Sequence, residues 1–196
     1  MHAIVTNSRI AAVVLAAGRS TRMGADKLLL PWRGRTILEC VLDAACALPH
    51  VILVGGLPSL NALPAQVTRV SCSLQERLPD QADSLKAGIR ALPPGMDGAM
   101  ILLGDMPLIT PELVGKLASA FRPGRFLAPR CDGRRGNPVL IPSDWFARVL
   151  ELEGDTGARP LLARPDAPVD YLDVDDPAIL TDVDTPDDYA RLKNQP

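Results

Sequence analysis

The sequence predicts an α/β fold, a three-layer sandwich in which helices cover both faces of a mostly parallel central sheet. Short apolar runs of strand length alternate with amphipathic segments from one end of the 196 residues to the other. Several of these runs are wholly apolar, as in strands that are buried on both faces. The 15 glycines and 19 prolines stand at the ends of these segments, so residues 1–196 are predicted to form one domain.

The predicted strands are short runs rich in apolar and β-branched residues, and turn-forming residues separate them from the helical segments. They comprise residues 10–15, 51–54, 67–70, 99–103, 126–129 and 138–141.

The predicted helices follow from amphipathic spacing and, in several cases, from a recognisable cap. Thr36 is followed three residues later by Glu39, which is the spacing of a capping box. Thr110 and Thr185 each precede a proline, and proline suits the first position of a helix. The predicted helices are residues 36–47, 83–91 and 143–152, a segment that starts at residue 111, and residues 186–193.

Charge and composition exclude several classes of partner. The 21 basic and 23 acidic residues leave a formal net charge of −2, so no overall positive field favours nucleic acid or an anionic membrane. The low aromatic content of 4% argues against a platform for stacked bases. No apolar run approaches the roughly 20 residues of a membrane-spanning helix. We therefore expect neither nucleic acid nor a membrane as partner.

Cysteine usage indicates a reduced protein of the cytoplasm. The four cysteines form no Cys-x-x-Cys pair, and the chain has two histidines, so neither a zinc site nor a disulfide framework is expected. The apolar run 10–17 after Arg9 is only eight residues long and arginines follow it closely, unlike a signal peptide. The cysteines are Cys40, Cys46, Cys72 and Cys131.

The most informative segment is the end of the first strand and the loop that follows it. Gly18 and Gly24 allow the backbone to approach a ligand closely, and three cations in one short loop suit a polyphosphate. The spacing is not that of a P-loop, since Lys27 lies three positions past Gly24. A solvated basic turn is the alternative, but open α/β sheets bind ligands at the ends of their strands. The turn and its cations are Ala16, Ala17, Gly18, Arg19, Arg22 and Lys27.

This segment resembles the signature of the MobA-like nucleotidyltransferases, L-A-[AG]-G-x-S-x-R-M-G-x-x-K. Residues 15–27, LAAGRSTRMGADK, match it at every fixed position. The Ala-Ala-Gly turn, followed by KLLLPW and TIL, is most similar to the molybdenum cofactor cytidylyltransferase branch. The resemblance extends from residue 10 to about residue 192. It implies a Rossmann-like sandwich of the nucleotide-diphospho-sugar transferase type.

The resemblance places the nucleotide at the first loop, with three cations around the triphosphate. It implies catalytic roles for Lys27, Arg22 and Asp105. Segment 79–86 is shorter than its counterpart in the family and lacks a glycine, which leaves the identity of the base open. The implied nucleotide-binding residues are Leu15, Ala16, Ala17, Gly18, Arg19, Arg22, Lys27 and Ser84.

Two carboxylates are candidates for a magnesium site. Asp105 directly follows an apolar run, where a carboxylate either faces the ligand crevice or caps the next turn. In the family the matching Gly-Asp-x-Pro aspartate is a magnesium ligand, and Mg²⁺ prefers such hard oxygen donors. The segment DVDTPDD at 182–188 resembles a second family motif. Asp184 is our choice for the second ligand, and Asp182 is the alternative. Asp187 and Asp188 are expected to stabilise the N-terminus of the helix that follows.

Two further segments resemble parts of the family that line the acceptor side of the cleft. RRGNPVL at 134–140 is similar to the family's R-G-H-P-V-L, and it implies Arg135 and Asn137 as acceptor-binding residues. Asn137 replaces the usual histidine, so a role for imidazole is not expected here. GDTGAR at 154–159 contributes Arg159, either as a phosphate contact or as an ion-pair partner of Asp155.

The resemblance as a whole implies a Mg²⁺-dependent enzyme that transfers CMP from CTP to the phosphate of molybdopterin and releases pyrophosphate. A phosphate nucleophile is already ionised near neutral pH, so no general base is needed. One alternative is a nucleotidyltransferase of the same fold that uses GTP or another phosphorylated acceptor, such as a sugar phosphate or phospholactate. Another is a cofactor-binding or delivery protein without turnover. A possible protein partner is a molybdenum hydroxylase that receives the product.

Overall fold

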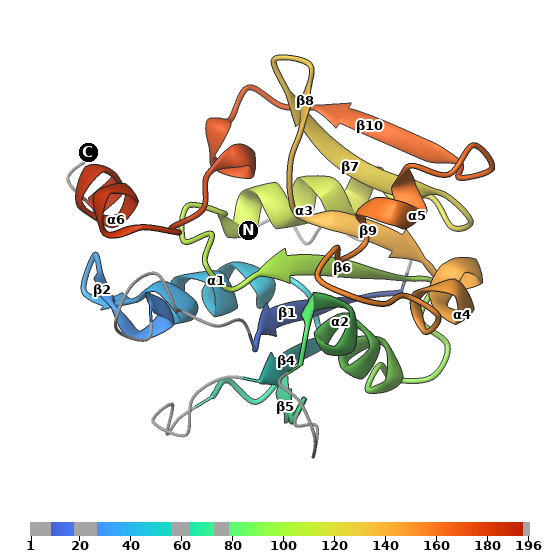
Figure 1. The fold of residues 1–196 in the computed structure, drawn as a ribbon, viewed down its shortest axis with the longest axis horizontal. Coiled ribbons are helices and arrows are strands. Elements are labelled where there is room, and N and C mark those ends of the chain that lie inside the picture. Colours follow the sequence, from blue (N-terminus) through green and yellow to red (C-terminus); the bar gives the residue numbers. More distant parts are fainter. Residues whose placement is uncertain (1–8, 18–26, 56–62, 73–78, 194–196) are drawn as a thin grey trace.

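The centre of the molecule is a twisted sheet with the strand order β10-β7-β9-β6-β1-β4-β5, in which β8 pairs with β7 (Figure 1). The computed structural model describes residues 9–17, 27–55, 63–72 and 79–193. The strands are β1 (Ile10–Ala16), β4 (Val51–Gly55), β5 (Val67–Val70), β6 (Gly98–Leu103), β7 (Phe126–Cys131), β8 (Arg134–Arg135), β9 (Val139–Pro142) and β10 (Val169–Asp173).

The expected mostly parallel sheet is confirmed. Strand β1 lies between β4 and β6 and pairs in parallel with both, and the β4–β5 and β7–β10 pairs are also parallel. Strand β9 runs antiparallel to β6 and β7. Only residues 132–138 separate β7 from β9, which is too short for a crossover helix, so the chain returns in the opposite direction.

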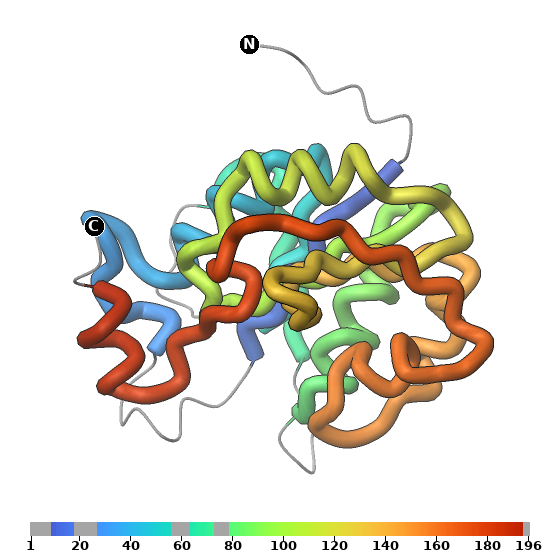
Figure 2. The backbone as a smooth tube through the Cα atoms, turned by 90° about the horizontal axis from the view of Figure 1, so that it is seen from above, coloured from blue at the N-terminus to red at the C-terminus, as the bar shows by residue number. Residues whose placement is uncertain are grey.

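Helices form a layer on each face of the sheet (Figure 2). Helices α1 (Ile37–Ala45) and α3 (Pro111–Ala120) cover one face, and α2 (Gln81–Arg90), α4 (Phe146–Val149) and α5 (Arg159–Leu162) cover the other. Side chains along β1 alternate between the two layers, since Ala12 and Val14 pack with α1 and Val13 packs with α2. The short helix α6 (Pro186–Lys193) lies apart from these layers at one end of the molecule.

The predicted helix starts are largely confirmed. Thr36 and Glu39 form the expected capping box, with the Glu39 amide donating to Thr36 Oγ1 over 3.2 Å. Thr110 caps α3 as expected. Helix α2 begins two residues earlier than predicted, because Asp80 accepts from the Asp83 amide over 2.8 Å and forms a capping box that sequence analysis did not recognise.

Other elements differ from the prediction. The single helix predicted over residues 143–152 is wrong, since this segment forms the short 3₁₀ turn η2 (Ser143–Trp145) followed by one turn of α-helix, α4. The sequence patterns did not predict β8, β10, α5, the small hairpin of β2 (Pro31–Trp32) and β3 (Arg35–Thr36), or the 3₁₀ turns η1 (Lys27–Leu29) and η3 (Pro177–Leu180). All four cysteines are free. Within the described ranges no helix is long and apolar enough to span a bilayer.

Candidate active site

The candidate site lies where the neighbouring strands β1 and β6 end side by side, at the left edge of the sheet in Figure 1. The Gly104 amide donates to the Leu15 carbonyl over 2.9 Å, and a Cβ atom on Gly104 would lie only 2.9 Å from that oxygen. Glycine therefore allows the chain to turn tightly against β1 at this point. The turn places Asp105 just beyond the sheet, beside the start of the first loop.

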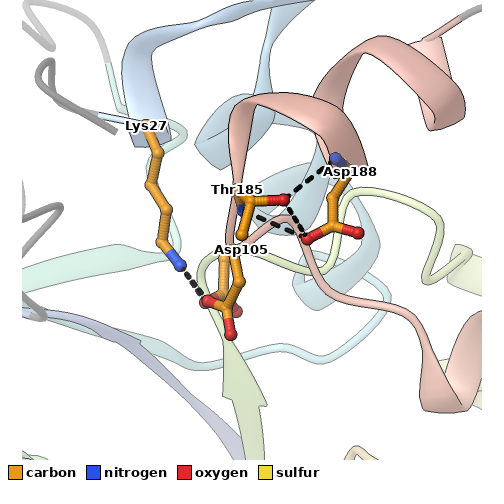
Figure 3. Close-up of polar contacts among 5 residues, drawn as sticks. Lys27, Asp105, Thr185 and Asp188 are labelled. Carbon is orange, nitrogen blue, oxygen red and sulfur yellow. Dashed lines mark hydrogen bonds and ion pairs between the residues drawn. The ribbon is translucent and has the colours of Figure 1, made fainter. Parts of the chain in front are cut away.

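Lys27 lies between two carboxylates that are far apart in the sequence. Its Nζ atom donates to Asp105 Oδ2 over 2.7 Å (Figure 3). It also donates to Asp184 Oδ1 over 2.7 Å. Those two oxygens therefore lie no more than twice this distance apart. The side chains of Lys27 and Asp105 are 13% and 21% exposed, and that of Asp184 is 44% exposed. The structure thus brings together the lysine and both aspartates chosen from the sequence.

A backbone hydrogen bond places Asp184 next to Asp105. The Val183 amide donates to the Asp105 carbonyl over 2.9 Å, and the Val183 side chain is fully buried in the core. Immediately afterwards Thr185 caps α6 by accepting from the Asp188 amide over 3.1 Å, and Asp188 accepts from the Thr185 hydroxyl (Figure 3). Asp188 therefore serves the helix N-terminus, as expected, while Asp184 faces Lys27.

The charge on Lys27 is stabilised by its partners. Burial lowers the pKa of Lys27, but the negative charges and hydrogen bonds of Asp105 and Asp184 outweigh burial and raise the pKa above its ordinary value. A raised lysine pKa contributes stability that is complete at neutral pH and is lost only above about pH 10.4, as pH rises through the folded-state pKa. Lys27 is therefore a fixed positive charge at neutral pH and not a proton acceptor.

The carboxylates fit a hard divalent cation. Asp105 Oδ1 is buried and has no hydrogen-bond partner among the described residues. This oxygen of the Asp105 carboxylate is therefore available as a metal ligand. In the same part of the chain no group of three or more His, Cys, Asp or Glu side chains has a metal-binding arrangement. The donor set suits Mg²⁺, which takes one or two carboxylates and completes its shell with phosphate oxygens and water.

Asp182 lies at the rim of this site. Partial loss of hydration, followed by the negative charges of Asp184 and Asp105, raises the pKa of its carboxyl group. Asp182 remains exposed to solvent, whereas Asp184 contacts Lys27 directly. The geometry therefore favours Asp184 over Asp182 as the second ligand.

The charge of Asp182 is expected to destabilise the metal-free protein at neutral pH. When a carboxyl group has a raised folded-state pKa, stability falls as pH rises from about 3.9 through that pKa. Asp182→Asn should therefore raise the melting temperature at pH 7 and give no gain below about pH 3.9, measured by thermal unfolding in EDTA. Asp187→Asn, in the first turn of α6, is the matched control and should not stabilise. A lower melting temperature for Asp182→Asn at pH 7 would contradict the expectation.

A cavity of about 380 Å³ opens beside the strand ends and collects the predicted acceptor residues. The predicted acceptor residues Arg135, Asn137 and Arg159 line it, and so does Leu15, which was predicted to bind the nucleotide. In the described part of the chain no ion pair engages Arg135 or Arg159. Two uncompensated cations in a cavity of this size suit an anionic ligand.

The wall that carries Asn137 is held by close backbone contacts. The Asn137 amide donates to the Ile179 carbonyl over 2.9 Å, and the Gly136 amide donates to the Pro129 carbonyl over 3.0 Å. A Cβ atom on Gly136 would overlap the backbone of Ile179, so only glycine fits there. Turn η3 thus supports the cavity wall from behind.

The opposite wall is the loop before α5, which packs on the start of α2. Asp155 Oδ1 accepts from the Gln81 amide over 3.2 Å, so the alternative of an Asp155–Arg159 ion pair is not realised. The Gly154 carbonyl accepts from the Ala82 amide over 3.2 Å. Gln81 and Thr156 also line the cavity, although sequence analysis did not select them. Thr156 lies within the GDTGAR segment already singled out, and the sequence signal for Gln81 is the Asp80 cap, which places Gln81 in the first turn of α2.

The remaining predicted nucleotide contacts divide into three groups. Gly18, Arg19 and Arg22 lie outside the described residues. Ala16 is buried. The neighbouring Ala17 packs closely on Gly55, since a Cβ atom added to Gly55 would lie 2.7 Å from the Ala17 Cβ. Ser84 is 5% exposed and does not line the cavity, and its hydroxyl donates to the Asp80 carbonyl over 3.1 Å. The Ser84 hydroxyl therefore supports the first turn of α2.

A lysine and two carboxylates lie at the carboxyl edge of a largely parallel sheet. This arrangement defines a class of α/β protein that can bind phosphate groups and a metal ion at the same site. Residues 12–169 match the MobA-like NTP transferase domain. The chain belongs to this family of nucleotidyltransferases.

Individual relatives match nearly the whole chain. It is 30% identical over 192 residues to the molybdenum cofactor cytidylyltransferase of Escherichia coli (strain K12), covering 96% of this chain and 97% of that protein. It is 34% identical over 195 residues to the purine catabolism protein PucB of Bacillus subtilis (strain 168), covering 92% and 94%. The crystal structure of Rv0371c from Mycobacterium tuberculosis H37Rv aligns with a TM-score of 0.83 and 31% identity, covering 96% and 100%. A complex of Rv0371c with manganese aligns with a TM-score of 0.78.

Proposed function

We propose that this protein transfers CMP from CTP to the phosphate of molybdopterin and releases pyrophosphate. The observation that carries this proposal is the position of Lys27, held between Asp105 and Asp184 beside a cavity lined by Arg135 and Arg159. Similarity to a molybdenum cofactor cytidylyltransferase over nearly the whole chain supports the choice of donor and acceptor. The free cysteines suit a reaction in the cytoplasm, with a molybdenum hydroxylase as the recipient of the product.

The chemistry requires positioning and positive charge. An oxygen of the acceptor phosphate attacks the α-phosphorus of CTP in line, and the bond to the bridging oxygen of the β-phosphate breaks. The electron pair of that bond leaves with pyrophosphate. The acceptor phosphate is ionised at neutral pH, so no proton has to be removed from the nucleophile. A site built around a permanently charged lysine is consistent with such a reaction.

Each side of the site has its own task in this proposal. Lys27, together with Arg19 and Arg22, binds the triphosphate and neutralises the charge that develops on the leaving group. Asp105 and Asp184 would hold Mg²⁺, which would supply further positive charge against the phosphate oxygens. On the acceptor side, the molybdopterin phosphate is bound by Arg135, Asn137 and Arg159. In this proposal the segment at residues 15–18 binds the nucleoside.

Donor preference tests the proposal directly. With Mg²⁺ and molybdopterin, the protein should release pyrophosphate from CTP faster than from GTP or ATP, since its Ala16-Ala17-Gly18 turn is the form typical of the cytidylyl branch. Pyrophosphate is measured by a coupled assay, with reactions lacking molybdopterin as controls. Equal or faster release of pyrophosphate from GTP would favour the alternative, a nucleotidyltransferase of the same fold that uses GTP. Molybdopterin binding without pyrophosphate release from any nucleotide would indicate a carrier protein.

A further inference from the structure

Two segments that are remote in the sequence touch at two points near the candidate site. The first contact is the 2.7 Å ion pair between Lys27 and Asp184. The second is a 2.6 Å hydrogen bond in which the Tyr189 hydroxyl donates to the Pro31 carbonyl. Pro31 comes four positions after Lys27, and Tyr189 comes five positions after Asp184. The two contacts therefore tie the same pair of segments together.

The second contact joins helix α6 to the segment that follows Lys27. The helix lies beside the β2–β3 hairpin and away from the central sheet (Figures 1 and 2). Its Tyr189 ring lies 6.2 Å from the ring of Trp32, which is 1% exposed and belongs to the core. Leu192 is also buried. These side chains anchor one face of α6 to the hairpin that follows Lys27.

The Asp184 side chain is half exposed, so its position depends on how helix α6, which follows it, is held against the hairpin. Asp184 directly precedes the cap of α6, and the Tyr189 amide donates to the Thr185 carbonyl over 3.1 Å in the first turn. A displacement of α6 on the hairpin would therefore move Asp184 relative to Lys27. Carboxylates that bind a metal ion need supporting contacts of this kind to hold their orientation.

We propose that Tyr189 is a positioning residue, which holds Asp184 against Lys27 through its hydrogen bond to Pro31. This inference rests on the proposed function, in which Asp184 and Asp105 bind the metal ion. It adds a residue that touches neither metal nor substrate. Tyr189 acts through Asp184 alone, so its effect on the site should disappear when Asp184 is replaced.

Tyr189→Phe removes the hydroxyl and keeps the ring that packs on Trp32. In this variant the Kd for Mn²⁺, measured on the protein alone by electron paramagnetic resonance, should rise about three- to tenfold. The kcat with CTP should fall by a similar factor, with little change in KM for molybdopterin. In an Asp184→Asn background the same substitution should change neither value further. Tyr171→Phe alters the other tyrosine, on the edge strand β10, and should have no effect.

A purely structural tyrosine gives a different result. A lower melting temperature for Tyr189→Phe with an unchanged Kd for Mn²⁺ and unchanged kcat would overturn the inference. So would an effect that persists in the Asp184→Asn background. If wild-type protein binds Mn²⁺ but does not turn over CTP, the proposed function fails and the Mn²⁺ measurement still decides the role of Tyr189. If it does neither, both proposals fail.

Discussion

Lys27→Ala is expected to lower turnover by about 100- to 1,000-fold, the loss that follows removal of one preorganised charge from a transition state. Lys27 alone among the described cations contacts both candidate metal ligands, and its raised pKa keeps it charged at the pH of the assay. The measurement is kcat/KM for pyrophosphate release from CTP, well below the melting temperature of the variant.

The same substitution should also cost about 1–2 kcal/mol of stability, because two carboxylates lose their shared counter-ion and Asp184 is only half buried. Saturating Mn²⁺ should restore the melting temperature, since the metal neutralises the carboxylates, but it should not restore turnover. Lys116→Ala, on the exposed side of α3, is the matched control and should leave both quantities unchanged. Full activity combined with reduced stability would show that Lys27 is structural.

Replacing the two carboxylates singly and together is expected to show that they act through one ion. Asp105→Asn should lower metal-dependent kcat/KM about 100-fold and Asp184→Asn about tenfold. The larger loss is assigned to Asp105 because its side chain is the less exposed and its Oδ1 atom is unpartnered within the described chain. The double variant should be about as active as Asp105→Asn alone.

The activity of each variant is measured across a series of Mg²⁺ concentrations, so that a raised activation constant separates loss of metal from loss of fold. Asp187→Asn provides the matched control, since Asp187 lies in the first turn of α6 and should leave the Mg²⁺ dependence unchanged. Effects of the two substitutions that simply multiply, with an unchanged activation constant, would rule out a shared ion.

Local patterns in the sequence predicted most of the fold because they report local physics. The capping threonines of α1 and α3 and the apolar strands were identified from neighbouring residues alone. Strand β10 was missed because it lies at the sheet edge and two of its five residues are acidic. Asp170 and Asp173 of this strand form ion pairs with arginines of the adjacent chain segment, so no apolar run marks it.

The sequence by itself determined the family, the basic loop after the first strand and the oxygen ligands available to a metal ion. Only the tertiary structure decided which of these groups meet. Lys27 and Asp184 are 157 positions apart. The hydrogen bond from the amide of buried Val183 to the Asp105 carbonyl places Asp184 beside Asp105, where Lys27 contacts both carboxylates. Likewise the Asp155 carboxylate binds the Gln81 amide in preference to Arg159 because its loop packs on α2. Such contacts depend on the packing of distant elements, which local residue patterns do not encode.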